Sequence, residues 1–174
     1  MSKRNYFQGK VVWLTGASSG IGKELSIQLS ELGATLILSS RKEQLLIELC
    51  QNLPRKEEHM VLPLDLAKPQ EFDDLMRQVE ATYGKIDLLI QNGGISQRAT
   101  AAESSEDVVR RIMEVNFFGN VLLMKKVLPK LRESKGQVLV ISSIAGKFGF
   151  FLRSSYSASK HALHGFYESL ALEE

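Results

Sequence analysis

Short, continuously apolar runs alternate along the chain with longer segments in which apolar residues recur every three or four positions. The short runs predict buried strands, and the periodic segments predict helices with one apolar face. Strands that are apolar throughout and alternate with helices indicate a parallel sheet covered on both faces, so we expect a doubly wound α/β fold with three layers. The predicted strands are residues 11–14, 35–39, 60–64, 86–90 and 138–141.

Proline positions refine this arrangement. Pro63 lies within the third run, and because proline removes a ladder donor we expect that strand at a sheet edge. Pro129 lies near the end of the fourth periodic segment and is expected to bend or end that helix. The fifth run contains neither proline nor charge, which predicts a strand flanked on both sides. The predicted helices are residues 21–32, 43–53, 70–83, 103–132 and 156–173.

The first predicted strand leads directly into a glycine-rich turn, Thr-Gly-Ala-Ser-Ser-Gly-Ile-Gly at residues 15–22, and a helix follows. Gly16, Gly20 and Gly22 allow tight turning and close approach of the backbone to a ligand, and free N–H groups at a helix start bind anions. Such a turn taken alone also fits an ordinary loop. The strand before it and the helix after it favour a phosphate-binding loop.

The second predicted strand ends in Ser39, Ser40, Arg41 and Lys42, where a dinucleotide-binding unit contacts the adenosine ribose. A carboxylate at this place suits the ribose hydroxyls of NAD, whereas an arginine suits the 2′-phosphate of NADP. No acidic residue stands here, so we expect Arg41 to bind that phosphate and NADP(H) to be preferred over NAD(H). The alternative is that Arg41 and Lys42 begin the next helix on its solvent side.

Tyr156 and Lys160 stand four residues apart in the last predicted helix, so both side chains project from one face. A phenol is normally too weak an acid to be poised at neutral pH, and a fixed ammonium beside it favours the phenolate. Such a pair can exchange a proton with a carbonyl or alcohol oxygen. Isolated pairs of this kind also occur on solvated helix faces. His161 and His164 follow without an acid–base partner pattern, and we expect surface or packing roles for both.

Composition and charge narrow the class of protein. The 174 residues carry 22 basic and 20 acidic side chains, a net charge of +2 that gives no electrostatic case for nucleic-acid or membrane partners. Cys50 is the only cysteine, which excludes an internal disulfide and a cysteine-rich metal site. The first ten residues contain no apolar leader and no run is long enough to span a membrane, so we expect a single cytoplasmic domain over residues 1–174.

Five motifs in this order resemble the short-chain dehydrogenase/reductase family, and the resemblance covers essentially the whole chain. The Rossmann-type fold of that family agrees with the predicted alternation of strands and helices. Residues 91–98, Gln-Asn-Gly-Gly-Ile-Ser-Gln-Arg, and residues 159–163, Ser-Lys-His-Ala-Leu, look particularly like the dehydrogenase/reductase member 7 group. The motifs are residues 15–22, residues 92–94, Asn116, Ser143 and the pair Tyr156 and Lys160.

The resemblance implies an NAD(P)-dependent oxidoreductase that interconverts a ketone or aldehyde with an alcohol, and it implies a role for each matching residue. Tyr156 would be the proton donor and acceptor, and Lys160 would favour its ionised form while bonding the nicotinamide ribose. Ser143 would hydrogen-bond the substrate oxygen. The implied cofactor-binding residues are Gly16, Ser18, Ser19, Gly20, Ile21, Gly22, Arg41, Asp65, Leu66, Asn92, Gly93, Tyr156 and Lys160.

Asn116 falls in the middle of an apolar segment, and a buried amide there needs hydrogen-bond partners, so it is either a structural clasp or a functional group. The resemblance implies that Asn116 supports a water leading protons away from Lys160. It also implies that the glycine-rich turn cradles the pyrophosphate, that Asp65 and Leu66 flank the adenine, and that residues 92–93 line the ribose region.

Two departures from the family pattern matter. The family more often has Asn-Asn-Ala-Gly where residues 91–94 are Gln-Asn-Gly-Gly, which should loosen local packing slightly. The chain also stops just after the Tyr156 helix, so we expect the last family strands and the segment that covers the substrate to be missing. A rival hypothesis is therefore a truncated, non-catalytic module that binds the dinucleotide or a partner protein. The resemblance also implies a homodimer or homotetramer that acts on a small carbonyl or alcohol.

Overall fold

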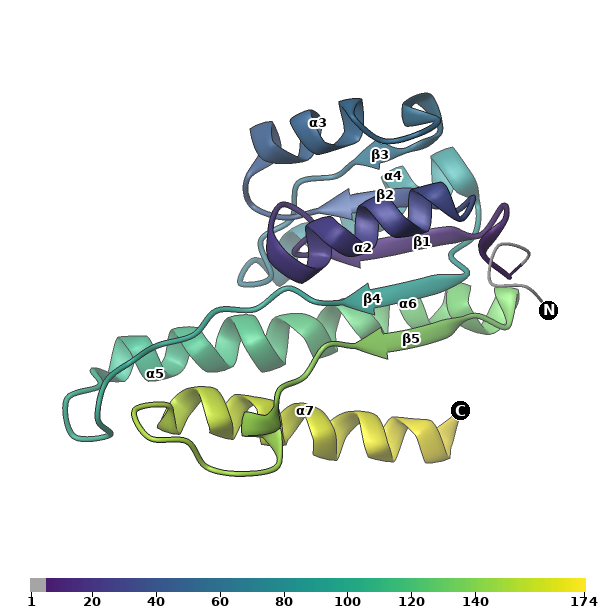
Figure 1. The fold of residues 1–174 in the computed structure, drawn as a ribbon. Coiled ribbons are helices and arrows are strands. Elements are labelled where there is room, and N and C mark those ends of the chain that lie inside the picture. The colour runs from purple at the N-terminus through teal and green to yellow at the C-terminus, as the bar shows by residue number, and fades with distance from the viewer. Residues whose placement is uncertain (1–5) are drawn as a thin grey trace.

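A five-stranded parallel sheet forms the centre of the computed structural model, which describes residues 6–174 (Figure 1). Its strand order is β3-β2-β1-β4-β5, and every pair of neighbouring strands is parallel. The predicted α/β fold is therefore confirmed. The strands are β1 Val11–Thr15, β2 Thr35–Ser39, β3 Met60–Val61, β4 Leu88–Gln91 and β5 Gln137–Val140.

Helices cover both faces of this sheet (Figure 1). They are α2 Gly20–Glu31, α3 Glu43–Gln51, α4 Phe72–Tyr83, α5 Glu106–Met113, α6 Gly119–Ser134 and α7 Ser154–Glu173. In β1, Val12 and Leu14 share a core with residues of α2 and α3, whereas Val11 and Trp13 share a core with residues of α4 and α6. A strand buried on both faces must be apolar throughout, which explains the continuous run. None of the helices in the described part of the chain combines the length and apolar character that a bilayer span requires.

The direction in which strands are added to the sheet reverses at β1. The chain passes from β1 outward to β2 and β3, and then places β4 and β5 on the other side of β1. The connections that follow β1 and β4 therefore diverge and leave a crevice beyond their carboxyl ends, which is where ligands bind in open α/β sheets.

The long helix predicted before the fifth strand has three parts. α5 is followed by a π-helical turn, η3 (Glu114–Phe118), and then by α6. Pro129 was expected to bend or end this helix; it lies inside α6, which continues to Ser134, so the proline does not end the helix. The flanking Val127 and Leu131 are buried. Burying each contributes about 1.5–3 kcal/mol, enough to offset the roughly 3 kcal/mol that an interior proline costs.

The two outer strands of the sheet have different surroundings. β3 lies at one edge, as predicted, but it ends at Val61, so Pro63 follows the strand and does not lie within it as the predicted range 60–64 implied. β5 lies at the other edge and pairs only with β4 within residues 6–174, although its apolar sequence predicted neighbours on both sides. As a result, Leu139 is 44% exposed.

His59 fastens β2 to α2 and to the loop before β3. Its Nδ1 accepts a hydrogen bond from the Leu36 N–H at 3.2 Å, and its Nε2 lies 2.9 Å from Ser30 Oγ and 3.0 Å from the Pro54 carbonyl oxygen. An imidazolium donates from both nitrogens, so protonation at Nδ1 would break the bond from Leu36. Burial lowers the pKa of His59; the Pro54 carbonyl opposes this, and the Arg55 guanidinium reinforces it.

Protonation of His59 should therefore destabilise the fold at acidic pH. Its pKa in the folded chain lies below the ordinary value of 6.5, so the unfolded chain takes up the proton first. The neutral His59 ring makes its full contribution to the free energy of unfolding above about pH 6.5. This contribution is lost as the pH falls below that value, by at most about 1.4 kcal/mol per pH unit. Chemical unfolding, followed by the fluorescence of the single tryptophan, Trp13, measures this loss. His59→Gln should show a shallower pH dependence than the wild type, and identical pH dependences would contradict the assignment.

Candidate active site

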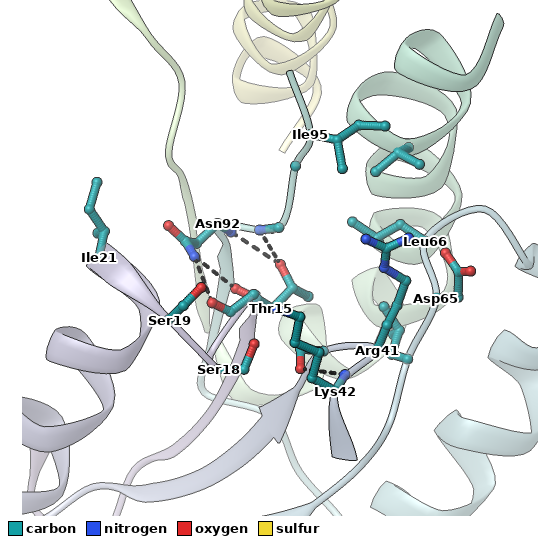
Figure 2. Close-up of a pocket in the computed structure, with 16 residues that line it drawn as sticks. Thr15, Ser18, Ser19, Ile21, Arg41, Lys42, Asp65, Leu66, Asn92 and Ile95 are labelled. Carbon is teal, nitrogen blue, oxygen red and sulfur yellow. Dashed lines mark hydrogen bonds between the residues drawn. The ribbon is translucent and has the colours of Figure 1, made fainter. Parts of the chain in front are cut away.

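A cavity of about 350 Å³ opens beyond the carboxyl ends of β1, β2 and β4, and we call it the switch-point cavity. Figure 2 shows Ile21 on one side of it, Arg41 and Asp65 on the other, and Asn92 between them. The lining residues are Thr15, Gly16, Ser18, Ser19, Ile21, Ser40, Arg41, Lys42, Leu64, Asp65, Leu66, Asn92, Gly93, Gly94, Ile95 and Val115.

The glycine-rich turn after β1 forms one wall of this cavity. Gly16 has a φ of +68° and Gly20 a φ of +53°, a backbone region that favours glycine. A Cβ on Gly22 would lie 2.2 Å from the Gly16 carbonyl oxygen, so a side chain there would displace the turn. Ser19, the N-cap of α2, makes no side-chain cap bond, which leaves N–H groups of the first helical turn for an anion. The turn therefore fits a pyrophosphate group.

Thr15 and Asn92 join the ends of β1 and β4. The Thr15 hydroxyl oxygen accepts hydrogen bonds from the backbone N–H groups of Asn92 at 3.1 Å and Gly93 at 2.9 Å. The Asn92 side-chain amide donates to the carbonyl oxygens of Thr15 and Gly16, both at 3.2 Å (Figure 2). A Cβ on Gly93 would lie 2.9 Å from Leu66 Cδ1. These contacts fix the glycine-rich turn against the loop after β4 and keep the space beside Gly93 free of side chains.

The opposite end of the cavity carries two cations and one acid. Arg41 and Lys42 line the cavity, and both are exposed immediately before α3, of which Lys42 is the N-cap, so either role expected for Arg41 fits its position. The Asp65 carboxylate accepts a hydrogen bond from the Ala67 N–H at 3.0 Å and lies 3.6 Å from the Arg111 guanidinium. Because Arg111 offsets the charge of Asp65, this end of the cavity is positive and suits a phosphate.

Tyr156 and Lys160 lie one turn apart on α7, with Lys160 Nζ 5.9 Å from the centre of the Tyr156 ring. Lys160 is only 5% exposed, which excludes the alternative of a solvated helix face. Its ammonium donates a hydrogen bond to the Ile141 carbonyl oxygen at 3.0 Å, just beyond β5. Burial lowers the pKa of Lys160, and the carbonyl bond holds the nitrogen near the phenol instead of in solvent.

Asn116 lies in the π-helical turn and is buried. Its Oδ1 accepts a hydrogen bond from the Ile95 N–H at 2.8 Å, and its Nδ2 donates to the Ile95 carbonyl oxygen at 2.9 Å and to Ser159 Oγ at 3.0 Å. The Ser159 hydroxyl in turn donates to the Tyr156 carbonyl oxygen at 2.7 Å. The structure therefore places Asn116 as a clasp that joins the loop after β4 to α7.

Ser143 begins η4 (Ile144–Gly146), a short 3-10 turn that packs against α7. Its hydroxyl oxygen accepts a hydrogen bond from the Ala145 N–H at 3.1 Å, and its carbonyl oxygen accepts one from the Gly146 N–H at 2.8 Å. The hydroxyl proton is not used in these bonds, so it can still be donated to another oxygen.

Gly94 connects the cavity to two of the predicted catalytic residues. This glycine lines the cavity, and a Cβ on it would lie 3.2 Å from Asn116 Oδ1 and 3.9 Å from Lys160 Nζ. Asn116 and Lys160 therefore adjoin the cavity at Gly94. A group that fills the cavity from the glycine-rich turn to Gly94 would end beside the Lys160 ammonium.

Most of the predicted cofactor-binding residues meet in the cavity. Gly20 and Gly22 shape the turn without lining the cavity, and Tyr156 and Lys160 lie beyond its lining. The residues that line it as predicted are Gly16, Ser18, Ser19, Ile21, Arg41, Asp65, Leu66, Asn92 and Gly93.

Sequence reasoning missed three apolar lining residues, Leu64, Ile95 and Val115. Two of these residues could have been found from their positions, because Leu64 ends the third apolar run and Ile95 follows the glycine pair after the fourth apolar run. Val115 gave no such signal, because it reads as an ordinary core position of a helix.

Comparison with known proteins agrees with this geometry. A family model described as short chain dehydrogenase matches residues 10–174. The chain belongs to that family. The mouse dehydrogenase/reductase SDR family member 7 is 45% identical over 170 residues, which cover 94% of this chain and 50% of the mouse protein. The Drosophila melanogaster dehydrogenase/reductase SDR family protein 7-like is 42% identical, with 98% of this chain and 54% of that protein covered.

Two solved structures share the arrangement of this fold. A short-chain dehydrogenase from Streptomyces avermitilis superposes with a TM-score of 0.90 at 33% identity, over 95% of this chain and 61% of that one. An alcohol dehydrogenase from the archaeon Thermococcus sibiricus, complexed with 5-hydroxy-NADP, superposes with a TM-score of 0.87 at 26% identity, over 95% of this chain and 72% of that one. The chain spans about half the length of the curated relatives it matches.

Proposed function

We propose that the chain forms the cofactor-binding and catalytic part of an NAD(P)-dependent oxidoreductase that interconverts a ketone or aldehyde with an alcohol. The observation that carries this proposal is the buried Lys160 ammonium, held beside the Tyr156 phenol at the end of a cavity with a phosphate-binding turn. Membership in the short chain dehydrogenases supports the proposal.

The side chains have separate roles in this proposal. Bound NADPH would supply the hydride. Tyr156 would give its proton to the substrate oxygen, and the Lys160 ammonium would stabilise the phenolate left behind. The Ser143 hydroxyl would donate a hydrogen bond to that oxygen as negative charge develops. Asn116 would hold the loop after β4 against α7, and its support of a proton-conducting water stays a prediction.

We further propose that NADP(H) is preferred over NAD(H), because Arg41 and Lys42 make one end of the cavity positive and Arg111 offsets Asp65. Arg41→Ala should therefore weaken NADPH binding and leave NADH binding little changed. A charge-assisted hydrogen bond contributes about 1.5–3 kcal/mol, so the expected loss is roughly 10- to 150-fold in the dissociation constant. Fluorescence titration with each cofactor measures both constants.

Arg41→Lys is the matched variant for this test. It keeps the charge but loses the planar fork of donors that fits a phosphate, so its NADPH affinity should lie between those of Arg41→Ala and the wild type. Equal losses for NADPH and NADH in Arg41→Ala would make Arg41 a structural residue and remove the basis for the cofactor preference.

A rival function is a dinucleotide- or partner-binding module without turnover. It is favoured by the edge of β5, which has no second neighbouring strand within the described residues. NADPH binding and NADPH oxidation, tested with a panel of ketones and aldehydes, separate the two functions. Both are measured on residues 1–174 and on an extended chain, in which the segment that follows the matched region in the mouse relative is appended after Glu174. Binding without turnover in both chains would favour the rival.

We also propose a homodimer or homotetramer, formed through the faces of the π-helical turn η3 and of α7 that carry aromatic rings. Phe118 is 47% exposed, its ring lies 5.2 Å from that of Phe117, and Phe117 lies 6.4 Å from Phe166 of α7. Light scattering of the extended chain should give a mass above that of one chain at micromolar concentration. Phe118→Arg should lower that mass, since it places a charge in the patch. A wild type that stays monomeric would contradict this proposal.

A further inference from the structure

Ser142, immediately before the predicted substrate-binding Ser143, is held by a histidine of the helix that carries Tyr156. Ser142 Oγ lies 3.0 Å from His164 Nε2, and His164 Nδ1 lies 3.5 Å from Glu168 Oε1. The Lys147 ammonium, just beyond η4, donates to the same Glu168 oxygen at 3.1 Å. We call these four residues the η4 clasp, because they attach both ends of the segment around η4 to α7.

The line of serine, histidine and carboxylate has the order found in hydrolases, but Gly146 packs directly against it. A Cβ on Gly146 would lie 2.9 Å from Ser142 Oγ and 2.8 Å from His164 Nε2. The Gly146 backbone therefore lies against both the hydroxyl and the ring. The close fit instead favours a role in holding η4 on the helix.

Within the η4 clasp, the contact between Ser142 and His164 constrains η4 more than the contact between Lys147 and Glu168 does. The side chains of Lys147 and Glu168 are 56% and 66% exposed, so solvent screens their attraction. The His164 side chain is only 27% exposed, and Ser142 is half-buried. A hydrogen bond in this less solvated position constrains the backbone more strongly.

We propose that His164 is a positioning residue, which sets the place of the Ser143 hydroxyl relative to Tyr156 through its contact with Ser142. This inference rests on the proposed function and deepens it. Ser143 is the N-cap of η4 and Tyr156 lies on α7, so their separation depends on how firmly these two elements are joined. A misplacement of about 1 Å in such a site can reduce turnover by roughly 100-fold. The sequence predicted only a surface or packing role for His164.

The test begins with a measurement that needs no turnover. Hydrogen exchange of residues 1–174 is followed by mass spectrometry at concentrations too low for association. His164→Ala and the milder Ser142→Ala should each speed exchange of the η4 amides about tenfold, the effect of losing one hydrogen bond. His161→Ala is the matched control, because the exposed His161 ring makes its hydrogen bond to the Ser157 carbonyl oxygen of its own helix, and it should leave these amides unchanged. Unchanged exchange in both clasp variants would overturn the proposal, even if the enzyme is active.

The second measurement uses the extended chain and asks whether His164 acts through Ser143. His164→Ala should lower kcat by about 10- to 100-fold with an unchanged dissociation constant for NADPH. In a Ser143→Ala background, His164→Ala should lower kcat no further, because the hydroxyl that it positions is already gone. Equal losses in both backgrounds would overturn the positioning role. An extended chain that reduces no carbonyl would contradict the proposed function, and the exchange rates would still decide whether the clasp holds η4.

Discussion

Tyr156→Phe in the extended chain is expected to lose at least about 100-fold of its carbonyl-reducing activity, because proton transfer by a positioned side chain contributes roughly 100- to 10,000-fold. The substitution removes one hydroxyl and keeps the ring. The Lys160 contact with the Ile141 carbonyl oxygen does not involve that hydroxyl, so the NADPH dissociation constant should change little. Steady-state turnover and fluorescence titration of the same preparation measure the two quantities.

Tyr167→Phe is the matched control for this prediction. Tyr167 lies on the same helix, but its hydroxyl donates to the Gln91 side chain inside the core, and burial raises its pKa. Its replacement should lower stability and leave turnover near the wild-type rate. Near wild-type activity in Tyr156→Phe would show that another group supplies the proton, and the assignment of the acid–base would fail.

Residues 1–174 expressed alone are expected to aggregate at micromolar concentration and to have little or no activity, whereas the extended chain should be soluble and active. Within residues 6–174, the outer edge of β5 is unpaired and carries neither proline nor charge, and Leu139 on it is exposed. A groove of about 740 Å³ also lies between α6, α7 and β5, with Leu128, Val138 and Leu170 in its lining. The helix that carries Tyr156 therefore rests on incomplete packing, and loose placement of the catalytic pair reduces turnover.

Static light scattering, thermal melting with and without NADPH, and turnover of both chains test this prediction. Leu139→Lys in residues 1–174 is a useful third sample, because a charge on the edge should reduce association without restoring the missing packing. It should therefore improve solubility and leave activity low. If residues 1–174 are soluble, melt cooperatively and are active, neither the edge of β5 nor the groove causes aggregation or loss of activity, and the prediction fails.

The fold was predictable because the central strands β1, β2 and β4 are buried on both faces, so their sequences are almost continuously apolar. The glycine-rich turn was predictable for a similar reason: Gly16 needs a positive φ and Gly22 touches a carbonyl oxygen, so the backbone demands glycine at both places. Burial of Lys160 was not evident from the sequence, because a lysine one turn after a tyrosine fits a solvated face equally well. Its partner, the Ile141 carbonyl oxygen, is a backbone group that no side-chain pattern reports.

Contacts between segments distant in sequence escaped prediction. The Thr15 hydroxyl accepts hydrogen bonds from two N–H groups after β4. His164 contacts Ser142. Thr15 belongs to a recognised motif and His164 does not, but no local pattern indicates either contact. Pro129 misled for a different reason, since the local cost of proline is smaller than the packing of Val127 and Leu131 that keeps α6 intact. In each case, packing and contacts between segments determine the structure where the local sequence is compatible with more than one outcome.

The most direct test of the central claim is the stoichiometry of NADPH consumption and alcohol formation by the extended chain. Purified protein is incubated with NADPH and each member of the ketone and aldehyde panel, and both the oxidised cofactor and the alcohol are quantified. The account predicts one alcohol formed per NADPH oxidised for at least one carbonyl, with that turnover abolished in Tyr156→Phe. NADPH binding with no alcohol formed from any member of the panel would contradict it.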